Sequence, residues 1–64
     1  MNMAKATHKN GTQIVLTETG RTMRRDRGRG EWYDARLPRT FDVGRWENLA
    51  ESVGYKVAGD DLVR

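Results

Sequence analysis

The stretch FDVGRWENLAESVG, residues 41–54, decides the fold because it carries the most regular pattern in the chain. Its apolar side chains recur at intervals of three, three, one and three residues, at Val43, Trp46, Leu49, Ala50 and Val53. This spacing predicts an α-helix of about three turns with one apolar stripe. One stripe needs one apolar surface to cover, so the helix also predicts a sheet packed against it.

Both ends of this helix carry residues that commonly end one. Asp42 has a short acceptor side chain suited to cap the first free amides, and Phe41 and Trp46 occupy the positions of a hydrophobic staple. Gly54 accepts the left-handed backbone conformation that stops a helix, and Tyr55 is placed to fold back onto the last turn. The helix is therefore predicted with defined limits.

A hairpin is predicted around the Asn-Gly pair at positions 10 and 11. Asn-Gly readily adopts the positive φ angles of a type I′ turn, so a tight turn is expected between strands over residues 3–8 and 12–17. In the second strand Ile14 and Leu16 share one face. That face is the candidate for the core.

Another strand is predicted over residues 31–37 and is ended by Pro38, which lacks an amide hydrogen. Tyr33 belongs to the alternating set expected in the core, whereas Trp32 and Arg36 belong to the face opposite the helix. A slip of one residue exchanges the two faces. The pattern therefore leaves open whether Trp32 or Tyr33 faces the core.

The remaining segments complete one domain over residues 1–64. Residues 21–30, rich in arginine and glycine, predict a loop or a protruding hairpin in which residues 22–25 extend as a strand. Residues 55–57 alternate like a short strand, and residues 58–64 are interpreted as a frayed tail. The predicted fold class is α+β: a small antiparallel three-stranded sheet, with room for a short fourth strand, and one α-helix packed on one face.

Positive charge is concentrated in the middle of the chain. Between residues 21 and 45 eight arginines accompany four acidic residues, while the whole chain carries a net charge of +3. This local surplus favours an anionic partner. The order β-β-β-α is also similar, in topology alone, to arm-type DNA-binding domains of phage integrases and to AP2-like domains, which implies a sheet presented to the major groove.

The residue inventory argues against catalysis and metal binding. His8 is the only histidine, Ser52 is the only serine, and cysteine is absent, so the usual nucleophile–base pairs and metal ligand sets are not available. Gly28 and Gly30 lead into a strand rather than a helix, unlike a phosphate-binding loop. We therefore expect no enzyme activity, no cofactor and no small-molecule substrate. The lack of cysteine and of a long apolar run favours a cytoplasmic location away from membranes.

The arginine-rich segment and the residues after it supply the candidate binding site. Guanidinium groups bind phosphate oxygens in bidentate fashion and stack on bases, and a neighbouring tryptophan adds stacking of its own. The sequence therefore predicts a non-catalytic protein that binds DNA or RNA through an arginine-rich loop and a sheet face. The candidate binding residues are Arg21, Arg24, Arg25, Arg27, Arg29, Trp32, Arg36 and Arg39.

Two other interpretations stay open. Arginine and tryptophan are favoured at interface hot spots, so the same residues fit a phage-type or accessory modulator that inhibits or redirects a larger protein through an acidic surface of that partner. Alternatively, Asp26, Asp34 and the other interleaved acids neutralise the arginines. The segment is then an ordinary solvated surface.

Overall fold

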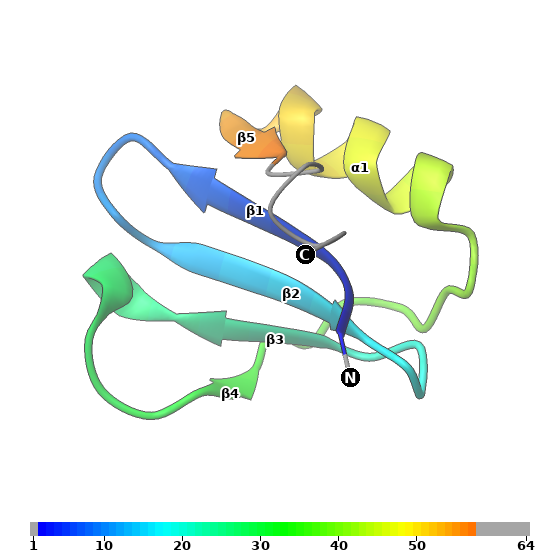
Figure 1. Cartoon of the computed structure of the whole chain (residues 1–64), viewed down its shortest axis with the longest axis horizontal. Helices are drawn as coiled ribbons and strands as arrows, with labels where there is room; N and C mark the ends of the chain where they lie inside the picture. The colour runs from blue at the N-terminus through cyan, green and yellow to red at the C-terminus, as the bar shows by residue number, and fades with distance from the viewer. Residues whose placement is uncertain (1, 58–64) are drawn as a thin grey trace.

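The computed structural model describes residues 2–57, which form one five-stranded antiparallel sheet and one helix (Figure 1). In chain order the elements are β1 (Asn2–His8), β2 (Gln13–Thr17), β3 (Thr22–Arg25), the single 3-10 turn η1 (Asp26–Gly28), β4 (Tyr33–Asp34), α1 (Val43–Ser52) and β5 (Tyr55–Val57). The strand order is β4-β3-β2-β1-β5. The α+β class with one helix and an antiparallel sheet is confirmed. The sheet has five strands, whereas three with room for a short fourth were predicted, because residues 22–25 join it as well as residues 55–57. The predicted tail, residues 58–64, lies outside the described residues.

The core lies between α1 and the β1–β2 hairpin. Ala4 pairs with Leu16 and Ala6 pairs with Ile14, so these side chains share the sheet face that α1 covers. Trp46 and Ala50 of α1 pack onto them, which confirms the face chosen from the pattern of β2. Because both β1 residues under the helix are alanines, α1 can lie close to the sheet.

The turn between β1 and β2 lies where the sequence predicts it, but the predicted turn type is wrong. Gly11 N donates to His8 O at 2.8 Å and His8 N donates to Thr12 O at 2.8 Å, which makes a three-residue loop. Only Gly11 in this loop has a positive φ, of 94°, whereas a type I′ turn needs two such residues. This pattern is that of a three-residue hairpin loop that ends in a bulge at the glycine. The Asn10 side chain stabilises it by accepting a hydrogen bond from Thr12 N at 2.9 Å.

The predicted N-cap at Asp42 and the predicted stop at Gly54 are confirmed, whereas no contact of the predicted Phe41–Trp46 staple is found within residues 2–57. The Asp42 carboxylate accepts from Arg45 N at 3.0 Å, and Gly54 has a φ of 95° with its amide donating to Glu51 O at 3.1 Å. The Phe41 ring lies against the β2–β3 turn, since a Cβ on Gly20 would approach Phe41 Cζ to 3.0 Å. The chain leading into α1 is therefore fixed to that turn.

The predicted strand over residues 31–37 is only two residues long, and its predicted core side chains stay outside the core. Arg36 has a φ of 59° and its amide donates to Asp34 Oδ1 at 2.7 Å, so a local side-chain turn ends the strand. Tyr33 and Leu37 are 45% and 41% exposed. Neither Trp32 nor Tyr33 belongs to the core cluster, which answers the question the pattern left open.

Candidate functional site

Strand β3 divides the predicted arginines between the two faces of the sheet. Arg24 pairs with Ile14 of β2, so it shares the face that α1 packs on, whereas Arg25 pairs with Gln13 and shares the opposite face. Arg21 reaches Asp34, which also lies on the opposite face because it pairs with Met23. The alternation of β3 thus prevents these arginines from forming a single patch.

Arg21 and Arg24 are each paired with a carboxylate. Arg21 Nη1 lies 3.8 Å from Asp34 Oδ2, and Arg24 Nε lies 3.0 Å from Asp26 Oδ1. The Tyr33 hydroxyl donates to the same Asp26 carboxylate at 3.0 Å. The hydrogen bond to Asp26 raises the pKa of Arg24, while partial removal from water and then the bond to Asp26 raise the pKa of Tyr33. Both ion pairs are exposed, so each contributes only about 0–1 kcal/mol and is readily exchanged for another anion.

Arg25 and Trp32 form a stacked pair on the face away from α1. The Arg25 guanidinium lies 4.6 Å from the centre of the Trp32 ring, and its Nε donates to Gln13 Oε1 at 3.2 Å. Both side chains are half-buried. The stack holds a flat cationic and aromatic surface next to the loop that follows β3.

The guanidinium groups of four other predicted arginines make no ion pair or hydrogen bond with any residue from 2 to 57. They are all exposed, and they are Arg27, Arg29, Arg36 and Arg39. The backbone beneath the first two is held in place, because Arg27 N donates to Thr12 Oγ1 at 3.3 Å and Arg29 N donates to Asp26 O at 3.0 Å. The loop is therefore attached to the β1–β2 turn while its guanidinium groups point into solvent.

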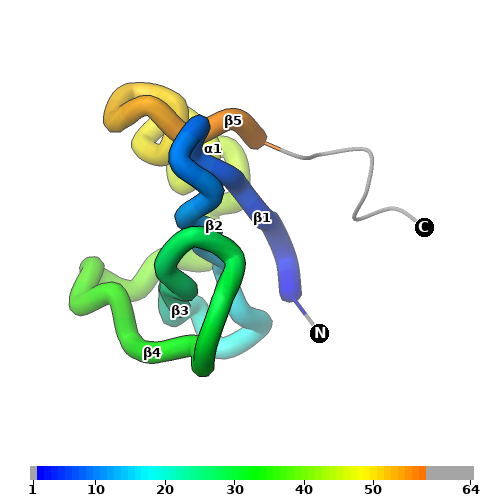
Figure 2. Tube along the Cα trace, turned by 90° about the vertical axis from the view of Figure 1, so that its left-hand side faces the viewer, coloured from blue at the N-terminus to red at the C-terminus, as the bar shows by residue number. Residues whose placement is uncertain are grey.

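The sequence did not predict a groove that lies beside α1, which we call the helix groove. Figure 2 shows α1 and the chain that follows β4 both lying to one side of β1. The groove is lined by residues from both segments. One part has a volume of about 410 Å³ and an adjoining part about 590 Å³, and both are lined by Leu37, Trp46 and Leu49. The first part is lined by residues of mixed character: Ile14, Ala35, Leu37, Trp46, Leu49, Ala50 and Val53 are apolar, and His8, Asn10, Thr12, Arg24 and Tyr55 carry polar groups.

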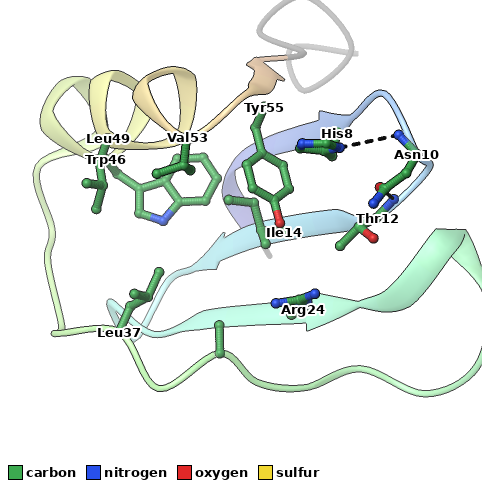
Figure 3. A pocket seen from close by; sticks show the side chains of 12 residues that line it. His8, Asn10, Thr12, Ile14, Arg24, Leu37, Trp46, Leu49, Val53 and Tyr55 are labelled. Carbon is green, nitrogen blue, oxygen red and sulfur yellow. Dashed lines mark hydrogen bonds between the residues drawn. The ribbon is translucent and has the colours of Figure 1, made fainter.

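The helix groove uses apolar side chains that the periodicity assigned to the core. Leu49 and Val53 are 50% and 59% exposed, and in Figure 3 Leu49 and Leu37 lie on opposite sides of the opening. The sequence does carry a signal for this groove, because the apolar stripe is wider than one packed face needs. Val43, Trp46 and Ala50 are enough to pack on the sheet, so Leu49 and Val53 are left beside that packed face. Sequence reasoning missed this because it gave the whole stripe one partner.

His8 and Ser52 each have a structural contact. The His8 ring packs edge-on against Tyr55 with ring centres 5.2 Å apart, and its Nδ1 accepts from Asn10 N at 3.3 Å. The Ser52 hydroxyl donates to Leu49 O at 2.6 Å within the helix. Within residues 2–57 there is no cluster of three or more side chains suited to hold a metal ion.

These features define a small α+β domain with an arginine-rich hairpin at one sheet edge and an apolar groove beside its helix. No family model, no curated protein and no solved structure matches the chain. In the part of the chain that the structure describes, α1 is too short and too polar to cross a membrane.

Proposed function

We propose that the protein binds nucleic acid without catalysis, in the cytoplasm, through a basic hairpin that we define as residues 22–39. The observation that carries this proposal is the set of exposed guanidinium groups at Arg27, Arg29, Arg36 and Arg39, none of which meets a carboxylate within residues 2–57. Free guanidinium groups bind phosphate oxygens and release counterions, which supplies most of the affinity for a nucleic acid backbone.

The other predicted residues have graded roles in this proposal. The Arg25–Trp32 stack offers a surface on which an unpaired base can lie, next to the loop that carries Arg27 and Arg29. Arg21 and Arg24 are already paired with carboxylates, so they contribute less than the unpaired arginines. We therefore expect the unpaired arginines to contribute more to binding affinity than Arg21 and Arg24, although all of them lie in one segment of the sequence.

The test is a binding titration of short duplex DNA and single-stranded RNA at several salt concentrations. The double variant Arg27→Ala/Arg29→Ala removes two phosphate contacts, so the slope of log K against log salt should fall by about 1.4 for single strands and about 1.8 for duplex. Lys56→Ala is the control, because Lys56 is exposed on β5 at the opposite edge of the sheet.

Equal loss of binding in the double variant and in Lys56→Ala would contradict the proposal, because the attraction would then be a property of the net charge. If single-stranded RNA binds more tightly than duplex DNA, and replacing Trp32 removes that difference, the partner is an unpaired nucleic acid strand. The alternative, a phage-type or accessory modulator that docks on an acidic protein surface, predicts one saturable protein partner whose capture survives nuclease treatment.

A further inference from the structure

We infer that the helix groove binds an acidic amphipathic peptide segment of a partner protein. The groove shares Arg24, Leu37 and Arg39 with the basic hairpin but contains none of the loop residues 26–32. The inference does not depend on nucleic acid binding. Three observations support it. The groove walls are apolar side chains exposed to solvent, arginines are among the lining residues, and the buried floor is unsuited to stacking nucleic acid bases.

The groove walls are apolar side chains that the fold leaves exposed. Leu49 lies on α1 and Val53 directly follows its last residue, four positions further on, and Leu37 faces them from the chain after β4 (Figure 3). Trp46 closes the floor and is only 2% exposed. A peptide with apolar residues along one side would remove the exposed parts of these walls from water, as in other helix-in-groove complexes.

The charges around the groove favour a peptide with negative charge. Arg24 lines the first part and Arg39 and Arg45 line the second, whereas no aspartate or glutamate lines either part. Two carboxylates outside the lining are bonded to lining residues: Asp26 pairs with the Arg24 side chain at 3.0 Å, and Asp42 accepts from the Arg45 amide at 3.0 Å. Carboxylates flanking the apolar residues of a peptide would therefore meet cations and not acids.

The same lining disfavours a nucleic acid in this groove. Bases bind single-strand sites by stacking on exposed aromatic faces. Here Trp46 is almost fully buried and its Nε1 is used in a hydrogen bond to Thr22 Oγ1. The exposed side chains shared by both parts, Leu37 and Leu49, are aliphatic, and the two other aromatic rings of the lining, His8 and Tyr55, pack edge-on against each other. The arginines of the groove thus share its lining with exposed aliphatic side chains, which suit leucine-like residues of a peptide.

The experiment is an NMR titration of the full-length labelled chain with a synthetic peptide in which leucines follow helical spacing and glutamates fill the other positions. We expect saturable shifts at Leu37, Leu49 and Val53. One control peptide carries lysines in place of glutamates and another carries serines in place of leucines. Neither control should bind, since the first reverses the charge and the second removes the apolar side.

The variant Leu49→Gln tests the apolar wall and should weaken the acidic peptide about ten-fold, the effect of losing one well-buried apolar contact. Arg39→Gln/Arg45→Gln should reduce both the affinity and its salt dependence. Glu51→Gln is the matched control, because Glu51 is exposed on α1 outside the lining of the groove. Circular dichroism establishes that each variant remains folded.

Several outcomes would overturn the inference. Equal binding of the lysine and glutamate peptides, or equal affinity of Leu49→Gln and the original chain, would remove its basis. Shifts of the groove residues on adding a DNA or RNA oligonucleotide in place of peptide would reassign the groove to nucleic acid. Shifts that follow protein concentration with no peptide present would assign it to a second copy of the chain.

Discussion

At the scale of single residues, the contact between Trp46 and Thr22 ties the helix to the far half of the sheet. Trp46 Nε1 donates to Thr22 Oγ1 at 2.9 Å, and the two residues are 2% and 1% exposed. α1 otherwise packs over β1, β2 and β5, so this bond fixes where the floor of the helix groove lies. A threonine in β3 is thus the buried partner that the indole of α1 requires.

We expect Thr22→Val to lower the free energy of unfolding by about 1–3 kcal/mol, because the shape is kept while a buried indole N–H loses its acceptor. Thr22→Ser keeps the acceptor and serves as the control, and chemical denaturation followed by tryptophan fluorescence measures both. A Val variant as stable as the original chain would mean that water reaches the indole in place of the hydroxyl.

At the scale of elements, the sequence predicted those features that depend only on residues close together in the chain. The helix and both of its ends follow from periodicity, from Asp42 and from Gly54, and all three are found in the structure. The short β4 could not be predicted, because Arg36 leaves the strand through a turn made with the Asp34 side chain. β3 pairs with its neighbours in sequence, β2 and β4, as the hairpin interpretation of residues 21–30 allowed, but no periodic signal in that segment favoured the hairpin over a loop.

The N-cap of α1 allows a prediction at this scale. Asp42→Ala removes the acceptor for Arg45 N and should lower the free energy of unfolding by about 1 kcal/mol, whereas Asp42→Asn keeps an acceptor and should cost less. Thermal unfolding followed by circular dichroism compares the two. If both variants lost the same stability, the charge of Asp42 and not its hydrogen bond would be responsible.

At the scale of the whole molecule, stability is distributed unevenly across the sheet. β1 is paired on both sides, by β2 and β5, and its alanines are fully buried. β4 is two residues long, exposed and paired on one side. The sequence predicted a binding site on this weakly held edge from its arginines, but it could not predict the split between faces, which follows from the register of β3.

Amide hydrogen exchange should therefore be slowest in β1 and β2 and fastest in residues 26–34, because the latter opens without disturbing the core. Exchange followed by NMR in the full chain measures this directly. If nucleic acid binds the basic hairpin, added oligonucleotide should slow exchange in residues 26–34. Uniform exchange rates across all five strands would instead show that the sheet opens as one unit.

Ala4 and Ala6, the two methyl side chains beneath α1, have a consequence beyond packing density. They set the height at which the helix stands above the sheet, and that height also sets how far Leu49 stands from Leu37. Larger side chains at either alanine would act as wedges and spread the two walls. The width of peptide that the groove accepts would therefore depend on Ala4 and Ala6, which do not line the groove.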